Sequence, residues 1–217
     1  MRSYNQYCSM ARALDVVGDR WTLLIVRELL TQGPCRFSDL RRGLPGIASN
    51  LLADRLREME AAGVVVRHDE PPPIAATLIS LTARGEDLGG VVRELVRWGA
   101  PLMFTPADGA EFRMHWFSLP ARYLCQDGAP DEPAVTVRLG DLYDGCDITA
   151  DGGRVDVQPC STERRPDAVV TAPPQLLVAL FTGTTPLRAA QAEGLVVDGS
   201  HAALERLLPN TGKGTDR

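Results

Sequence analysis

The sequence has 217 residues, with 23 basic against 28 acidic side chains and a net charge of −5 at pH 7. Hydrophobic residues make up 44% of the chain, which is enough for packed cores and excludes wholesale disorder. No apolar stretch approaches the roughly 20 residues that cross a bilayer. The first residues show no secretory-signal pattern, so we expect a cytoplasmic protein.

Charge is distributed unevenly along the chain. Residues 1–104 hold 13 arginines against 12 acidic side chains, a net charge of +1, whereas the remainder carries −6. A nucleic-acid partner requires local positive charge, which only the first part offers. The turn-rich stretch 105–109 follows a long helical pattern, so we predict two domains, 1–104 and 105–217. The polar tail from about residue 209 is expected to be disordered.

The first half begins with a series of predicted helices. Apolar side chains recur at helical spacing in the first of them, at Tyr7, Met10, Leu14 and Val17. Asp19 is placed to cap a second helix, 21–30, which is apolar nearly all round and therefore buried. A short helix ending at Arg42, a tight turn and a longer helix over 49–62 follow. This order is that of a helix-turn-helix, whose second helix enters the major groove of DNA.

Two strands after that helix predict a wing. Residues 64–67 and 77–81 have strand character, and the prolines of 71–73 exclude a helix between them. Thr82 then caps a long helix, 82–98, with an apolar side formed by Leu88, Val91, Val92, Leu95 and Trp98. Such a helix either packs against its symmetry mate or covers its own core. We expect a homodimer through the first helix and helix 82–98.

Several separate motifs carry a resemblance to a known family. They are Cys8 with 10–25, Arg36–Leu40, Leu44–Ile47 and Asn50–Leu52. On these motifs, residues 4–104 resemble the HxlR family of bacterial transcriptional regulators. The resemblance implies a homodimeric winged helix-turn-helix that binds double-stranded operator DNA. Spacing alone predicts only a winged helix with DNA as its expected partner.

The expected recognition helix, 49–62, offers candidate contacts to DNA. With Leu52 inward, a helical wheel turns four side chains outward: Asn50, Ala53, Asp54 and Arg57. Asparagine suits adenine and arginine suits guanine, whereas Asp54 would accept from a cytosine amine or orient Arg57. Phosphate contacts are expected around the start of the helix, from Arg36, Arg41, Arg42 and Ser49. The alternative is that these arginines form a solvated helical face.

Two places depart from the family pattern. Ala48 stands where a serine cap is expected before the recognition helix, so Ser49 is predicted to cap it instead. The wing carries Asp69 and Glu70, whose charges repel phosphate. Arg67 is therefore the candidate minor-groove contact of the wing, and we expect no strong contribution from the acids beside it.

The cysteines raise a separate question. Five of them are widely spaced with no CxxC pair, which argues against a disulfide framework or a zinc site. Cys8 stands at the start of the first helix, where the helix N-terminus favours a thiolate. Some HxlR relatives sense oxidants through a cysteine at the matching position, so the resemblance implies a redox switch at Cys8. The alternative is a small, inert core residue.

The second half is predicted to be a separate α/β unit. Strands are expected at 135–139, 146–149, 155–158, 168–171 and 195–197, and helices at 175–181, after 186 and after 200. A strong hairpin turn, 151–153, joins the second and third strands. Strands and helices around one sheet make an α+β layer. The predicted fold class is therefore α+β, a winged helix-turn-helix followed by an α/β sandwich.

A second resemblance covers part of this half. Its motifs are Leu176-Leu177 to Leu180, Gly183-Thr184, Pro186-Leu187 and 194–199. On these motifs, residues 167–208 are similar to the C-terminal half of sterol-carrier-protein-type domains. The resemblance implies an apolar pocket for a hydrophobic small-molecule effector. Its candidate lining residues are Trp116, Phe117, Tyr123, Leu177 and Phe181, and the alternative is a closed core that helps dimerisation.

Enzyme function is disfavoured by the sequence. The three histidines have no ligand-like spacing, and no nucleophile elbow, phosphate loop or dinucleotide fingerprint is present. We therefore expect no catalytic residues, no metal and no cofactor. The second candidate function is a lipid-binding module whose N-terminal half serves only dimerisation. Salt-dependent binding to duplex DNA distinguishes the two.

Overall fold

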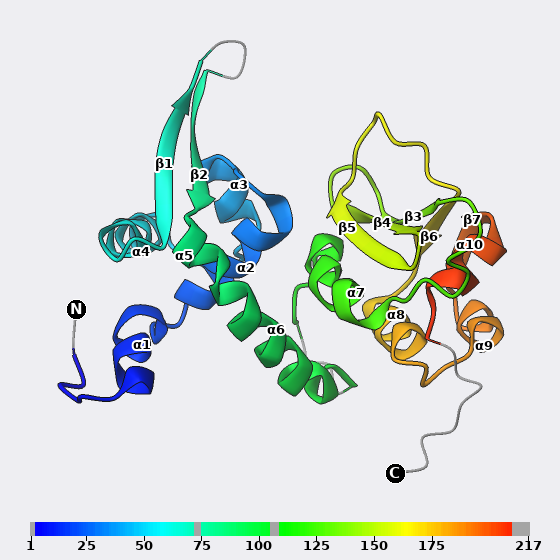
Figure 1. Cartoon of the computed structure of the whole chain (residues 1–217), viewed down its shortest axis with the longest axis horizontal. Coiled ribbons are helices and arrows are strands. Elements are labelled where there is room, and N and C mark those ends of the chain that lie inside the picture. Colours follow the sequence, from blue (N-terminus) through cyan, green and yellow to red (C-terminus); the bar gives the residue numbers. More distant parts are fainter. Residues whose placement is uncertain (1–2, 72–74, 105–108, 210–217) are drawn as a thin grey trace. The chain divides into compact units, whose positions relative to one another are not determined.

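The computed structural model describes residues 3–71, 75–104 and 109–209 (Figure 1). The chain divides into two compact units, Met1–Leu95 and Val96–Arg217. This division falls inside a helix and lies N-terminal to the predicted boundary after Phe104. Part of the predicted proline turn and the tail beyond residue 209 lie outside the described residues. Within the described ranges, no helix has the length and apolar character needed to cross a membrane.

The first unit consists of short helices and a two-stranded hairpin. Its elements are α1 (Ser9–Val17), α2 (Thr22–Gln32), α3 (Phe37–Arg42), α4 (Ser49–Ala61), β1 (Val65–Glu70), β2 (Ala76–Leu81), α5 (Ala83–Glu86) and most of α6 (Leu88–Gly99). β1 and β2 pair antiparallel, and Figure 1 shows their hairpin projecting from the helices. The order α3, turn, α4 and hairpin is a winged helix-turn-helix, as predicted.

A small apolar core holds the first unit together. Its most deeply buried side chains come from α2, α3, α4 and the turn between the last two: Ile25, Val26, Leu40, Leu44, Leu52 and Leu56. Leu52, Leu56 and Met59 recur at helical spacing, so one stripe of α4 is buried and the opposite stripe faces outward. Each such side chain stabilises the packed state by about 1.5–3 kcal/mol.

Two of the predicted helix caps are wrong. Asp19 does not cap α2, which begins after Trp21 without a side-chain cap; its carboxylate pairs with Arg55 instead. Ser49 is the first residue of α4 and not its cap. The N-cap position is held by Ala48, whose methyl group cannot accept a hydrogen bond.

The helix predicted over 82–98 is interrupted. Thr82 is confirmed as a cap, because its Oγ1 accepts a hydrogen bond from the Gly85 amide at 3.1 Å. The helix that it caps ends at Glu86, and α6 begins after a turn at Asp87. α5 packs closely on the hairpin, since a Cβ on Gly85 would approach the Val64 carbonyl oxygen to 2.1 Å. The apolar face predicted for one long helix therefore belongs to α6.

The second unit contains a five-stranded sheet. Its elements are the end of α6, η1 (Ala100–Phe104), η2 (Met114–Phe117), α7 (Ser118–Leu124), β3 (Val135–Gly140), β4 (Gly145–Asp151), β5 (Arg154–Pro159), β6 (Ala168–Thr171), α8 (Pro174–Phe181), α9 (Leu187–Ala192), β7 (Val196–Gly199) and α10 (His201–Leu207). The strand order is β5-β4-β3-β6-β7, and β3 and β6 are parallel while the other neighbours are antiparallel. The five predicted strands are confirmed, whereas η2 and α7 were not predicted.

Alternation along the strands gives this sheet one apolar and one polar face. Val137 and Leu139 face a core to which α7, α8, α9 and α10 all contribute, while Thr136 and Arg138 lie on the other face. The predicted hairpin turn joins β4 and β5 through Gly152-Gly153, both with positive φ, which glycine adopts without strain. The whole chain is therefore of mixed α+β class.

Candidate nucleic-acid interface

The exposed stripe of α4 gathers the predicted base-contacting side chains. Asn50, Asp54 and Arg57 are exposed, and Ala53 is half-buried at the edge of the stripe. Asn50, Asp54 and Arg57 lie opposite the buried stripe of the same helix. The structure thus brings the predicted set together on one surface of α4, while the opposite surface of this helix packs into the core.

Asp54 and Arg57 form an ion pair on that surface. The Arg57 guanidinium contacts the Asp54 carboxylate one turn away, while the two side chains stay 68% and 51% exposed. An exposed pair of this kind contributes at most about 0.5 kcal/mol to stability. Its effect is to restrict where the guanidinium lies, which fits the second role predicted for Asp54, the orientation of Arg57.

The predicted phosphate contacts surround the start of α4. Arg41, in the last turn of α3, donates from Nη1 to the Ser49 hydroxyl at 2.8 Å. Arg42 pairs with Asp39 at 3.0 Å but remains 75% exposed. Arg36, at the N-cap of α3, is also exposed. Cationic groups therefore gather beside the helix N-terminus, an arrangement suited to phosphate oxygens.

The helical wheel places Arg55 on the flank of α4, where the sequence predicts either a phosphate contact or packing against the protein. Its guanidinium contacts Asp19 in the α1–α2 loop and Glu58 on α4, at 2.7 Å from the Glu58 Oε2. The side chain is only 19% exposed, unlike those of Arg42 and Arg57. Sequence position gives no signal for this contact, because Asp19 lies 36 residues away.

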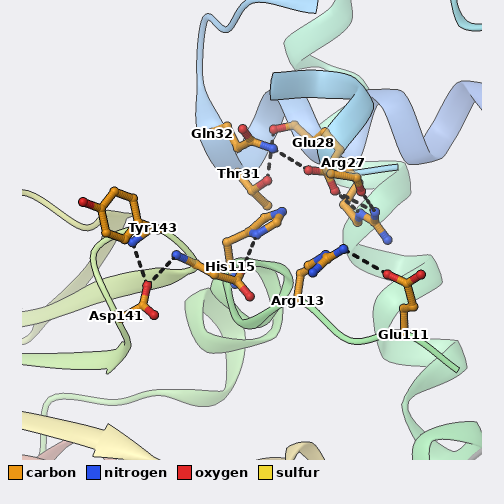
Figure 2. A network of polar contacts seen from close by, with 11 residues as sticks. Arg27, Glu28, Thr31, Gln32, Glu111, Arg113, His115, Asp141 and Tyr143 are labelled. Atoms are coloured by element: carbon orange, nitrogen blue, oxygen red, sulfur yellow. Dashed lines mark hydrogen bonds and ion pairs between the residues drawn. The ribbon is translucent and has the colours of Figure 1, made fainter. Parts of the chain in front are cut away.

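A buried polar network supports the turn before α4. Glu28 on α2 is fully buried and accepts hydrogen bonds from Arg27 at 2.6 Å and from Gln32 at 2.5 Å (Figure 2). Arg27 also donates to the Gly43 carbonyl at 3.2 Å. A Cβ on Gly43 would come within 1.9 Å of the Glu28 Oε2, so only glycine fits there. The network fixes the C-terminal end of α3 against α2.

The predicted wing carries acidic side chains beside its candidate DNA contact. Arg67, the candidate minor-groove contact, lies within β1, where its Nε is 3.8 Å from the Glu60 carboxylate of α4. Asp69 accepts a hydrogen bond from Thr77 across the hairpin at 2.6 Å. Acidic side chains therefore lie beside Arg67 on the described part of the hairpin, and a weak contribution of the wing to DNA binding stays a prediction.

Comparison with known proteins identifies the family of the first unit. Residues 16–105 match the HxlR-like helix-turn-helix family. The HTH-type regulator YvaP of Bacillus subtilis is 37% identical over 87 residues, which are 40% of this chain and 80% of that protein. YodB of the same organism, also an HTH-type transcriptional regulator, is 34% identical over 95 residues, 43% of this chain and 84% of YodB.

The chain belongs to the HxlR family. It is an HxlR-type helix-turn-helix transcriptional regulator whose matched region is the winged unit. A solved structure of reduced YodB aligns at 31% identity over 48% of this chain and 100% of that chain, with a TM-score of 0.40. The match to the family ends at residue 105, so nearly all of the second unit lies outside it.

The five thiols of this HxlR protein differ sharply in their surroundings. All are free, and Cys8 is exposed at the N-cap position of α1. The backbone amides of Ala11 and Met10 lower the pKa of Cys8. Burial raises the pKa of Cys35, Cys146 and Cys160 to about 12. Cys8 is therefore the thiol best suited to ionise and react near neutral pH.

The candidate pocket residues of the second unit do not share one environment. Phe117, Leu177 and Phe181 are buried in the core, where the rings of Phe117 and Phe181 pack with centroids 5.2 Å apart. Trp116 is half-buried and packs edge-on against Phe112, and Tyr123 is exposed. Three of the five thus fill the interior that was expected to hold a ligand.

Buried ion pairs are the distinctive polar feature of the second unit. Arg138 and Asp147, on neighbouring strands, pair at 2.6 Å with side chains 10% and 0% exposed. Arg206 on α10 pairs with Asp127 at 2.7 Å, with side chains 4% and 0% exposed. Over the described residues, no three histidine, cysteine or carboxylate side chains gather where they could hold a metal ion.

Proposed function

We propose that this HxlR regulator binds operator DNA as a homodimer and reads a pseudo-palindromic site through α4. The observation that carries the proposal is the exposed stripe of α4, where Asn50 and Arg57 lie beside the cationic start of the helix. Asparagine and arginine recognise adenine and guanine edges, while Arg41 and Arg42 are placed for phosphates. Such a protein acts where the DNA is, so we expect it in the cytoplasm.

Exposed apolar side chains support the homodimer. Tyr7 and Met10 lie at the first helix and are 108% and 64% exposed. On α6, Val92 is buried but Val91, Leu95 and Trp98 are exposed, so most of its predicted apolar side is exposed in the described part of the chain. A second copy that covers both helices would remove this surface from water. A dimer also matches the two-fold symmetry of a palindromic operator.

The test is duplex binding as a function of salt. We expect the logarithm of the affinity to fall linearly with the logarithm of the salt concentration, because bound cations release counterions from DNA. Arg57→Ala should cost about 1–3 kcal/mol on the preferred sequence and relax the preference at one base pair. Arg41→Ala should weaken all sequences alike and reduce the salt slope by about 1. Equal losses on preferred and random duplexes for both variants would contradict the assignment.

Oxidation of Cys8 is proposed as one form of regulation. The thiol is exposed, its pKa is lowered by helix amides, and it lies beside the apolar surface assigned to the dimer. Oxidation there would change the charge and size of a group at that surface. We expect an oxidant to alter operator affinity in the wild type and not in Cys8→Ser, with Cys35→Ser as the matched control. An identical response of wild type and Cys8→Ser would eliminate the switch.

Regulation by a hydrophobic effector is a second proposal, and it concerns the second unit, for which the sequence predicts a likeness to sterol-carrier-type domains. The five-stranded sheet covered by helices on one face gives the apolar setting that such a ligand requires. Because Phe117 and Phe181 fill that interior together, a ligand would have to displace one ring. Native mass spectrometry of the full chain purified from cells tests for a retained molecule. A lipid-binding module without DNA affinity, the alternative function, would retain the molecule and show no salt-dependent duplex binding.

A further inference from the structure

Arg55 lies on the flank of α4, between the exposed stripe and the buried one. Its guanidinium contacts two carboxylates, Asp19 and Glu58, and its side chain is only 19% exposed. The Arg55 Nε is buried and donates no hydrogen bond to any of the described residues. A guanidinium enclosed in this way has little freedom to reach a phosphate, so its hydrogen bonds and charge stabilise contacts within the protein.

Asp19 connects this contact to a different part of the unit. It lies in the short loop that joins the end of α1 to the start of α2, and its carbonyl accepts from the Thr22 amide at 3.1 Å. α1 itself buries only Ala11 and Val17. A helix with so small a buried surface is positioned largely by what happens at its ends. The Asp19–Arg55 contact joins one such end to the middle of α4.

We infer that Asp19 and Arg55 are positioning residues, which set the placement of the recognition helix α4 relative to the dimerising helix α1. The inference rests on the proposed function, in which α1 meets the partner subunit and α4 enters the DNA. In a two-fold dimer, the geometry between these two helices sets the separation of the two recognition helices. Asp19 and Arg55 therefore control which half-site spacing the dimer accepts.

The negative charge of Asp19 allows its positioning role to be distinguished from simple repulsion of DNA. Removing an acidic side chain from a DNA-binding surface strengthens binding on electrostatic grounds alone, because repulsion of the phosphates falls. If Asp19 positions α4 through Arg55, Asp19→Asn instead weakens binding to the operator. It also leaves affinity for unrelated DNA unchanged or slightly raised. The two effects differ in direction, so one measurement separates them.

The experiment uses the full chain and a duplex that the wild type selects from a randomised DNA pool. Binding is measured to that duplex, to versions with one base pair added or removed at the centre, and to an unrelated duplex. One base pair displaces a half-site by about 3.4 Å and rotates it by about 35°. The variants are Asp19→Asn, Arg55→Gln and the charge exchange Asp19→Arg with Arg55→Asp. Glu60→Gln, which removes an acid from α4 without touching Arg55, is the matched control.

We expect Asp19→Asn and Arg55→Gln each to weaken operator binding about tenfold, a typical coupling between contacting residues. Both should lose preference for the selected spacing over the altered ones. Arg55→Gln should keep the wild-type salt slope, whereas loss of a phosphate contact lowers that slope by about 1. The charge exchange should restore part of the spacing preference, which a fold defect would not allow. Glu60→Gln should bind as tightly as the wild type or more tightly.

Three results would overturn the inference. Stronger operator binding by Asp19→Asn would show that its charge acts only through repulsion. A reduced salt slope in Arg55→Gln would show that Arg55 touches phosphate. Unchanged spacing preference in both variants would show that the contact does not place α4. If the wild type selects no duplex at all, the proposed function is wrong, and this inference fails with it. The wild type alone shows that outcome, without any variant.

Discussion

In the first unit the arginines around α3 and α4 keep their guanidinium groups at the surface, whereas in the second unit two arginines are enclosed with one carboxylate each. Arg42 and Arg57 are 75% and 68% exposed, against 10% and 4% for Arg138 and Arg206. Exposed pairs add little stability, while an enclosed pair is costly to break. The same residue type is thus left at the surface around α3 and α4 and is enclosed in the second unit.

Arg55 is the exception that makes the comparison informative. It lies in the first unit, yet at 19% exposure and with two carboxylate partners it resembles the enclosed arginines of the second. Under the proposed function, exposed arginines such as Arg57 contact DNA, whereas an enclosed arginine with two carboxylate partners positions the helix.

The largest effect is expected from the second unit. Asp147→Ala leaves Arg138 buried without its carboxylate and should lower the free energy of unfolding by about 3–5 kcal/mol. Hydrogen exchange of the β3 and β4 peptides measures the loss directly. Asp156→Ala, an exposed change on the adjacent strand β5, is the control and should stay within about 0.5 kcal/mol. Similar losses for both variants would show that the enclosed pair has no special role.

Sequence predicted the elements of both units far better than it predicted these pairs. The amphipathic spacing of Leu52, Leu56 and Met59 fixed the buried face of α4, and alternation along β3 fixed the faces of the sheet. These are local patterns with known periods. The pair Arg206–Asp127 joins residues 79 apart, and nothing in either neighbourhood specifies the other. Long-range contacts of charged groups require the tertiary fold to be known.

The helix caps failed for a related reason. Asp19 has the residue type of a cap and the right place before a helix, so local preference alone assigned it that role. In the fold its carboxylate instead contacts the Arg55 guanidinium. A charge-assisted contact of this kind is stronger than a hydrogen bond from a backbone amide. The candidate DNA contacts on α4 could be predicted because they depend only on helical geometry. The residues that hold α4 in place could not.

An intermediate effect on stability is expected at the buried Glu28 carboxylate of the first unit. Gly43→Ala places a methyl group against the buried Glu28 carboxylate and should cost about 1–3 kcal/mol of stability by overpacking. It should also weaken duplex binding, because the turn that leads into α4 shifts. Gly90→Ala on α6, where a Cβ meets nothing closer than 3.7 Å, should instead stabilise by up to about 1 kcal/mol. Urea unfolding of both variants gives the comparison, and equal stability would contradict the close packing.

The smallest effect concerns the pH dependence of the second enclosed pair. Hydrogen bonds from Arg206 lower the pKa of Asp127 to about 2. An unfolded aspartate has a pKa near 4. Because the pKa is lower in the folded protein, ionisation of Asp127 stabilises the folded state. This contribution is present above about pH 4 and is lost as the pH falls toward 2. Asp127→Asn keeps an acceptor oxygen, and Arg206 keeps its bonds to the carbonyls of Pro133 and Glu132, so the loss at neutral pH should be modest.

The difference in urea midpoint between the wild type and Asp127→Asn should therefore be largest at neutral pH and should shrink between pH 4 and pH 2. The measurement follows the transition that exposes α10, with the exposed Asp131→Asn as the control. A difference that stays constant down to pH 2 would mean that the Asp127 charge does not contribute. Arg206 would then be held only by its hydrogen bonds to backbone carbonyls. The arginines of the two units would in that case differ in burial and not in the strength of their ion pairs.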